Sequence, residues 1–386
     1  MTDGANRGSR YGREMQVSVG RDRGEKRQLR SIEEKFRKYE VRAEGYEFVP
    51  ALMHSLRRYV YEQRTDSELD RRLRLALEEI PEAEEIAKLA VQRDDEIPRE
   101  LKSRVFSPRY LDLPLDHAIE PDETRAILER AKLLQNRSVA AIPALVENIP
   151  ELGVSPVAIA VPTRPTHEGC CCPPPRPPRH PPPPPPPRHR YEIAYAKLYC
   201  VDESDPEWGG SDEPYVVFGV MTEEMAEAGS AAFATHTPVY GGVDDGETRP
   251  GSGDENLRLF GFTGPRAIDS SVLVTASCFE NDLGDPTKTT NAIRTALTAV
   301  ATKAAAAGGV AGWIVAGVAV VGIGVTYLVD LVGADDGING TQALSLTQAE
   351  ADGRTASVNP HLFPPLHFDG GDDDGIYDVF LKLTRV

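Results

Sequence analysis

The sequence predicts a multidomain protein with an α-helical N-terminal domain, a polyproline linker and a C-terminal all-β sandwich that carries an inserted hydrophobic helical hairpin. Three observations predict this architecture. Apolar residues recur at helical spacing before residue 163, twelve prolines lie between positions 173 and 187, and short segments rich in β-branched and aromatic residues follow position 190. The predicted boundaries are 1–27 for a disordered leader, 28–163 for the helical domain, 164–190 for the linker, and 191–386 for the sandwich with its insertion at 289–331.

The charge of the chain is unevenly distributed. The 386 residues carry a formal net charge of −17, and residues 191–386 hold 29 Asp and Glu against 10 Lys and Arg. An acidic surface of this kind repels nucleic acid and anionic lipid unless a cation lies between them. We therefore expect no nucleic acid among the partners of this protein.

The leader at 1–27 is rich in Gly and Arg and has few large apolar residues. It lacks the apolar core of a secretory signal peptide, so we expect no such peptide and a cytoplasmic protein, with membrane association left open. A solvated tail and a targeting or docking signal are the two interpretations of the leader. The five cysteines include the consecutive Cys170, Cys171 and Cys172. Adjacent thiols in an odd count do not make a disulfide framework, which fits a reducing compartment.

The helical domain is predicted from apolar positions that recur about every four residues. Prolines separate these runs, because proline ends or kinks a helix. The charged faces of such helices are either solvated surface or a means of homo-oligomerisation or docking to a protein partner. The apolar runs are Leu52, Leu56 and Val60; Leu69, Leu73 and Leu77, which follow the cap candidates Asp66 and Ser67; and Ile127, Ala131 and Leu134, which follow Asp122.

The linker at 164–190 contains the run PPPRPPRHPPPPPPP. Polyproline II extends by about 3.1 Å per residue, so positions 173–187 span about 45 Å. We expect this semi-rigid spacer to hold the two halves of the protein apart; binding of a proline-recognising protein partner is the alternative use. Three histidines near the cysteine triplet raise metal binding and lipidation as interpretations, but neither the spacing nor the flexible setting matches an ordered site.

Strand-like segments dominate the region after the linker. They are short, rich in β-branched and aromatic residues, and bounded by Gly, Pro and Asp. Several such strands with loop signals between them predict an all-β sandwich. The segments are 191–200, 215–220, 257–262, 271–279 and 377–383.

A stretch of 26 residues without a charge, Ala304 to Val329, interrupts the strand pattern. As a helix it is about 39 Å long, and about 20 residues cross a bilayer core, so its length permits a membrane span. Small residues at intervals of four allow close helix packing in lipid, whereas burial inside the domain is the alternative interpretation. The residues predicted to contact lipid are Gly308, Gly312, Trp313, Ile314, Val318, Val321, Ile323 and Val325.

A single span at 304–329 places the strands before residue 280 and after residue 340 on opposite sides of a membrane. An intact sandwich needs both sets of strands on one side. We therefore favour helices at 290–302 and 304–330 that form a hairpin, which either inserts into lipid conditionally or stays buried. A bitopic protein whose flanks fold separately is the alternative.

Acidic loops follow several of the predicted strands. The first strand ends near Asp202 and Asp205, followed by Gly210, Ser211 and Asp212 and then by Pro214, Tyr215 and Val216. A later strand ends at Glu280 and Asp282, and Asp335, Asp336, Ile338 and Gly340 follow the insertion. These motifs resemble those of the C2 domain, a β-sandwich that binds calcium and phospholipid through loops at one end. The resemblance covers the C-terminal half and implies that the insertion divides the second calcium loop.

The resemblance implies a calcium site, and the chemistry of the loops is compatible with it. Calcium takes six to eight oxygen ligands, which carboxylates from converging loops supply best. Solvated acidic turns are the alternative, because Asp and Gly are ordinary turn residues. We interpret Asp372, Asp373 and Asp374 as a plain hairpin turn. The candidate calcium ligands are Asp202, Asp205, Asp212, Glu280, Asp282, Asp335 and Asp336.

Enzyme activity is not expected, because the sequence contains no GxSxG, P-loop, HExxH or CxxC pattern. Two main hypotheses follow. In the first, calcium brings the acidic loops to a lipid membrane and the glycine-rich hairpin inserts or oligomerises. In the second, the protein is a structural or adaptor component of a larger assembly and its hairpin is buried permanently.

Overall fold

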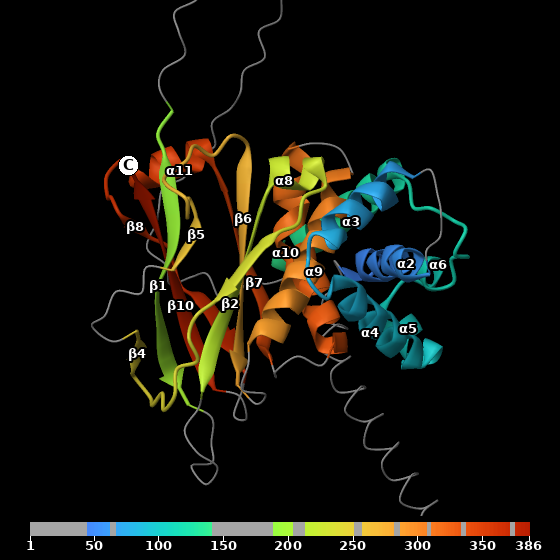
Figure 1. The fold of residues 1–386 in the computed structure, drawn as a ribbon, viewed down its shortest axis with the longest axis horizontal. Coiled ribbons are helices and arrows are strands. Elements are labelled where there is room, and N and C mark those ends of the chain that lie inside the picture. Colours follow the sequence, from blue (N-terminus) through green and yellow to red (C-terminus); the bar gives the residue numbers. More distant parts are fainter. Residues whose placement is uncertain are drawn as a thin grey trace, which may run out of the picture.

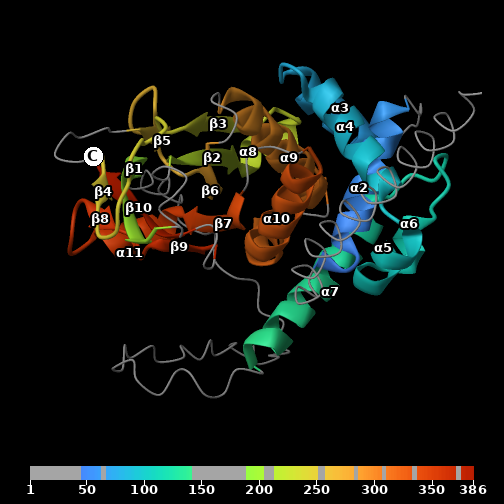
Figure 2. The same ribbon diagram turned by 90° about the horizontal axis from the view of Figure 1, so that it is seen from below.

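The computed structural model describes residues 45–61, 67–140, 188–203, 213–250, 257–281, 286–306, 310–332, 337–370 and 375–386. The predicted leader and most of the predicted linker lie outside these ranges. The described residues form successive layers, which are two antiparallel sheets, a pair of long helices and a group of N-terminal helices (Figure 1). Figure 2 shows the same order of layers from a perpendicular direction.

The N-terminal layer confirms the helical pattern predicted from the sequence. Leu52 and Leu56 face inward from α2, and Leu69, Leu73 and Leu77 face inward from α3. The spacing of these leucines gives each helix one apolar stripe, which it buries against its neighbours. The helices are α2 (Phe48–Val60), α3 (Glu68–Glu78), α4 (Ala83–Glu96), α5 (Arg99–Val105), α6 (Pro108–Leu111) and α7 (Pro121–Ala140).

The C-terminal region contains two antiparallel sheets, and each of the five predicted strands coincides with an observed one. The first sheet has the order β4-β1-β10-β8, with β5 on β1 and β9 on β10, and the second has the order β3-β2-β6-β7. The strands are β1 (Tyr191–Asp202), β2 (Pro214–Thr222), β3 (Phe233–His236), β4 (Thr248–Arg249), β5 (Arg258–Phe260), β6 (Ser271–Glu280), β7 (Gly337–Thr347), β8 (His361–Leu362), β9 (Leu366–Asp369) and β10 (Ile376–Arg385).

The inner faces of the two sheets enclose an apolar core. Val216, Phe218 and Val220 alternate along β2 toward the first sheet, whereas Tyr215 and Val217 point to the opposite face. Both faces of β2 are therefore buried, which explains its nearly continuous apolar sequence. Two short helices, α8 (Glu223–Ala228) and α11 (Gln348–Thr355), complete this region.

Two long helices lie between β6 and β7 in the chain, α9 (Thr287–Ala306) and α10 (Val310–Val332), and they pack against each other. α9 covers the outer face of β2 at Gly219, where an added Cβ would lie 2.6 Å from Leu297 Cδ2. On their other side, both helices contact α2, α4 and α7. A second hydrophobic core thus joins the N-terminal helices, α9, α10 and the outer face of the second sheet.

This second core corrects one prediction. We expected the proline-rich segment to hold the halves of the protein apart, yet residues from both halves share the core. The physical reason is that the N-terminal helices bury their apolar stripes against α9 and α10, and burial of apolar surface favours this packing over separation of the two halves. A spacer limits how far two domains separate but does not prevent them from packing.

Candidate functional site

A group of ionisable and hydroxyl side chains lies inside the second core, between the N-terminal helices and the α9–α10 pair. We call it the buried polar layer. Charged groups are costly to bury unless they are paired, so such a layer is unusual within a hydrophobic core. Its members are His54, Ser55, Arg57, Arg58, Asp70, Asp94, Lys102, Glu123, Lys303 and Tyr327.

Asp94 of α4 is the centre of one half of the layer. Only 2% of the residue is exposed, and its carboxylate accepts hydrogen bonds from Tyr327 Oη at 2.5 Å and Lys102 Nζ at 3.1 Å. Arg57 of α2 also donates to this carboxylate. Burial and the neighbouring Asp94 carboxylate hold the pKa of Tyr327 well above its usual value, so the phenol remains a donor. Asp94 therefore ties α10 to α2, α4 and α5.

Lys303 of α9 occupies the other half of the layer in a different environment. Its ammonium donates to the carbonyl of Ala51 at 3.1 Å and to Ser55 Oγ at 2.9 Å, both on α2. Neither acceptor carries a charge. Burial of the side chain, which is 2% exposed, lowers the pKa of Lys303 to about 7.

A serine next to a lysine of lowered pKa is an arrangement that supports nucleophilic catalysis. Here, however, Ser55 is 3% exposed and its hydroxyl also bonds to the carbonyl of Ala51. Neither Ser55 nor Lys303 lines either of the two cavities that open beside α2 and α4. The pair joins two helices.

His54 and Arg58 complete the layer on the α2 side. His54 Nε2 lies 2.8 Å from the carbonyl oxygen of His117, and burial lowers the pKa of this imidazole below its usual value. Arg58 pairs with Asp70 of α3 at 3.0 Å. These two side chains of α2 therefore bond within the N-terminal layer, to α3 and to the segment before α7, whereas Ala51 and Ser55 of α2 bond to α9.

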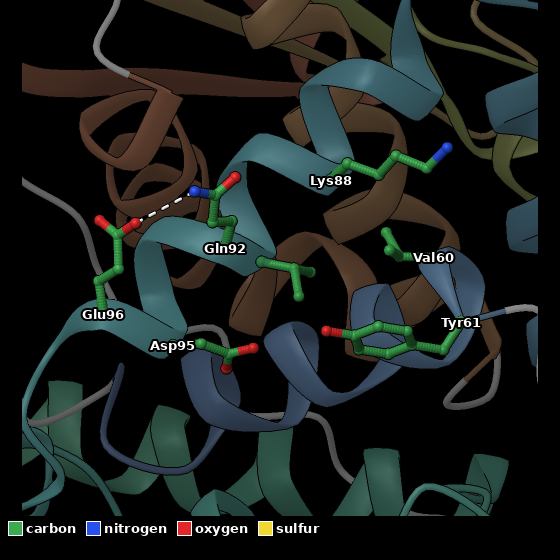
Figure 3. Close-up of a pocket in the computed structure, with 7 residues that line it drawn as sticks. Val60, Tyr61, Lys88, Gln92, Asp95 and Glu96 are labelled. Carbon is green, nitrogen blue, oxygen red and sulfur yellow. Dashed lines mark hydrogen bonds between the residues drawn. The ribbon is translucent and has the colours of Figure 1, made fainter.

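Two cavities open on the solvent side of α2 and α4. One, of about 680 Å³, is lined by residues that include Val60, Tyr61, Lys88 and Gln92 (Figure 3). The other, of about 470 Å³, includes His54 and Arg99. Polar groups of the lining pair among themselves, as in the 3.1 Å hydrogen bond from Gln92 to Glu96. None of the described residues that line these cavities has a buried side-chain nitrogen or oxygen without a hydrogen-bond partner.

The described structure places two of the seven candidate calcium ligands. Asp202 is the exposed last residue of β1, and Glu280 is the half-buried last residue of β6, opposite Pro214 at the start of β2. Among the residues that the structure describes, no group of three or more His, Cys, Asp and Glu side chains could hold a metal ion. Asp205, Asp212, Asp282, Asp335 and Asp336 lie outside the described residues.

The predicted hairpin turn at Asp372, Asp373 and Asp374 also lies outside the described residues. The strands on its two sides, β9 and β10, pair with each other in antiparallel register.

Only some of the predicted lipid-contacting residues have side chains that the structure describes. Val321, Ile323 and Val325 are buried in the second core, between α9 and the N-terminal helices. The backbone of α10 includes Gly312, Trp313, Ile314 and Val318, but the side chains at these positions and all of Gly308 lie outside the described residues. None of the described helices has the length and apolar character that crossing a bilayer requires.

No protein-family model matches the chain, and no curated protein or solved structure matches it. The likeness to the C2 domain therefore rests on the loop motifs and on the two antiparallel sheets.

Sequence reasoning missed the buried polar layer. Lys303 offered one signal, since it is the last charge before 26 uncharged residues. Asp94 offered none, because it is one of two adjacent aspartates in an amphipathic helix and only the fold distinguishes them.

Proposed function

We propose that this is a non-enzymatic membrane-associating protein in which the N-terminal helices shield an apolar α9–α10 hairpin and release it at a lipid surface. One observation carries the proposal. The end of α10, which belongs to the least polar stretch of the chain, is covered by the N-terminal helices across an interface that contains buried charges. An interface that opens must tolerate water, and charged groups lower the cost of exposing it.

In this proposal α10 has two alternative environments, protein and lipid. In the closed form, Val321, Ile323 and Val325 pack against protein. Lipid is an apolar solvent of similar quality, so the hairpin loses little burial when a bilayer replaces the N-terminal helices. Asp330 closes the uncharged stretch near the end of α10, at the base of the hairpin, where a charged group can stay in the polar interface.

The acidic end of the sandwich is the second part of the proposal. The C2 likeness assigns calcium to the loops near Asp202 and Glu280, where the cation would offset their repulsion of anionic lipid. Calorimetric titration of the full chain with calcium tests this part, because a bound ion raises thermal stability by mass action. An absence of both binding heat and a stability change contradicts it. Asp202→Asn with Glu280→Gln is expected to weaken binding, and Asp269→Asn, on a different loop, serves as the control.

A disulfide that locks α10 to the N-terminal segment tests the release step. An added Cβ at Gly45 would lie 2.8 Å from Ile323 Cγ2, so Gly45→Cys with Ile323→Cys places two thiols within bonding reach. The background carries serine at positions 170–172. We expect leakage of vesicles of phosphatidylcholine and phosphatidylserine from the reduced protein and little from the oxidised one. The single variant Gly45→Cys controls for the substitution and the redox conditions.

The alternative is a structural or adaptor protein in which α10 stays buried. The extent of the second core favours it, because residues from α2 to β6 contribute to one continuous cluster. Absence of leakage and of vesicle binding from both oxidised and reduced protein supports this alternative and contradicts release. Equal leakage from the two forms shows that lipid activity does not require α10 to move.

A further inference from the structure

We propose that the contact between α2 and α9 is a proton-operated latch, in which Lys303 and His54 take up protons as the N-terminal helices separate from α9 and α10. Acidification then weakens the attachment of the helices, and alkaline conditions strengthen it. The biological use of the latch rests on the proposed function, because release of α10 is the step that it controls. Its pH dependence does not rest on lipid at all.

The geometry of the two bases carries this inference. Lys303 and His54 are each 2% exposed, and each faces only neutral acceptors. Lys303 bonds to the Ala51 carbonyl and the Ser55 hydroxyl. His54 lies against the His117 carbonyl. A charge in that position has no partner in contact with it. When α2 moves away, both side chains reach water, which solvates the charged form.

The charged groups around Lys303 do not cancel this effect. Asp70 of α3 and Glu123 of α7 act on it from a distance, but they pair with Arg58 and Arg109. The positive charges of Arg57, Arg58 and Lys303 all disfavour the protonated form of His54.

The other elements packed against α9 contribute charges that are engaged elsewhere or remote. α4 and α10 supply Asp94, Tyr327 and Asp330, and the first two of these bond to each other. α8 supplies Glu223, Glu224 and Glu227, and β3 supplies His236. The glutamates of α8 and His236 of β3 belong to elements that pack beside β2. These elements contact the face of α9 that carries Leu297 rather than the face that carries Lys303.

Lys102 shows the contrast within the same layer. It is also buried, but its ammonium lies 3.1 Å from the Asp94 carboxylate. An opposite charge in contact with a buried ammonium offsets the cost of its burial, whereas a carbonyl and a hydroxyl offset less of that cost. The two lysines therefore form a natural pair of test and control.

The direction of the pH effect follows from proton uptake. The pKa of Lys303 is lowered to about 7 in the closed form, and an exposed lysine titrates near 10.4. Between these values the open form binds more protons, so raising the pH favours the closed form by about tenfold per pH unit. Below pH 7 both forms hold the lysine proton and its effect is flat. His54, whose pKa is lowered by burial, adds a further opening tendency below about pH 6.5.

Hydrogen exchange of α2 backbone amides, measured between pH 6 and 9, tests the latch. Native protein and Lys303→Met are compared at each pH, so the intrinsic pH dependence of exchange cancels from their ratio. We expect that ratio to fall about a hundredfold from pH 6 to pH 9, while the ratio for Lys102→Met stays constant across the range. A constant ratio for Lys303→Met overturns the latch.

The variant His54→Gln and a parallel measurement of vesicle leakage complete the test of the latch. His54→Gln retains a hydrogen-bonding side chain, and we expect it to remove the extra opening below pH 6.5. If Lys303→Met does not fold, the native profile decides, since α2 exchange that tracks the intrinsic rate at every pH overturns the proposal. Vesicle leakage is measured in parallel. A pH-dependent ratio without leakage supports the latch and contradicts the proposed function, whereas leakage with a constant ratio contradicts the latch alone.

Discussion

The two hydrophobic cores of this protein differ in the polar groups they contain. Between the sheets, the buried polar atoms are neutral, such as the hydroxyls of Tyr195 and Tyr240, which bond to each other, and the thiols of Cys200 and Cys278. Between the N-terminal helices and α9–α10, the core includes the charged buried polar layer. One core is therefore insensitive to pH in the neutral range, whereas the cohesion of the other depends on protonation.

The difference indicates that the two cores serve different purposes. A purely apolar core is difficult to open, because every exposed side chain costs free energy. A core with buried charges gains back part of that cost through solvation when it opens. We infer that the sandwich is a permanent unit and that the N-terminal helices are a cover attached to it.

The largest effect is expected in the core between the sheets. Phe218 is fully buried and packs against Tyr195 with ring centroids 5.6 Å apart. Phe218→Ala leaves a cavity and should lower the free energy of unfolding by about 3–5 kcal/mol. Urea unfolding at pH 6 and pH 9 should give the same loss. A loss that differs between these pH values contradicts the comparison, because it places titrating groups in the core between the sheets.

A slightly smaller effect, of about 3 kcal/mol, is expected when Asp94 loses its charge. Asp94→Asn leaves the Lys102 ammonium without its carboxylate, whereas Arg57 keeps Asp95 at 2.8 Å, and an unpaired buried charge is destabilising. Urea unfolding measures the loss. The double variant Asp94→Asn with Lys102→Met removes the unpaired ammonium and should recover part of the stability. If the double variant is no more stable than Asp94→Asn, the ion pair is not what holds this interface.

The sequence predicted the elements of both cores but not their union. Strand and helix periodicities are local, so segments such as 271–279 and the leucines of α2 and α3 were placed correctly. An apolar stripe predicts that one face of a helix is buried, but it does not identify the segment that buries it. The cover proved to be a segment some 250 positions away, since Lys303 bonds to Ala51 and Ser55.

The residues of the candidate site were even harder to predict from local sequence patterns than the contacts between helices. Asp94 and Asp95 are neighbours in the sequence, yet their side chains are 3% and 47% exposed. Helical phase distinguishes their directions only after the partner helices are in place. For the acidic loops, the sequence predicted strands at 191–200 and 271–279 with Asp202 and Glu280 just after them, and the structure makes these two residues the last of β1 and β6.

The smallest predicted change in stability concerns the close packing of side chains around α10. At Gly324 of α10, an added Cβ would lie 2.8 Å from Val300 Cγ2 and 3.4 Å from Leu52 Cδ2. Gly324→Ala gains helix propensity but crowds these side chains, for a net loss of about 1 kcal/mol. Gly353 of α11 has no atom within 4 Å of an added Cβ, so Gly353→Ala should instead stabilise by up to about 1 kcal/mol.

Thermal unfolding of the two variants compares the regions directly. Opposite signs show that glycine at 324 is required by the close approach of α10 to Val300 of α9 and to Leu52 of α2 rather than by flexibility of the helix. If both variants are more stable than the native protein, the side chains around Gly324 can accommodate a methyl group. The N-terminal helices then pack against α10 less tightly than their buried contacts indicate. Opening of the cover removes the Leu52 contact but keeps the Val300 contact within the α9–α10 pair, so vesicle leakage by Gly324→Ala should rise only slightly above that of the Gly353→Ala control.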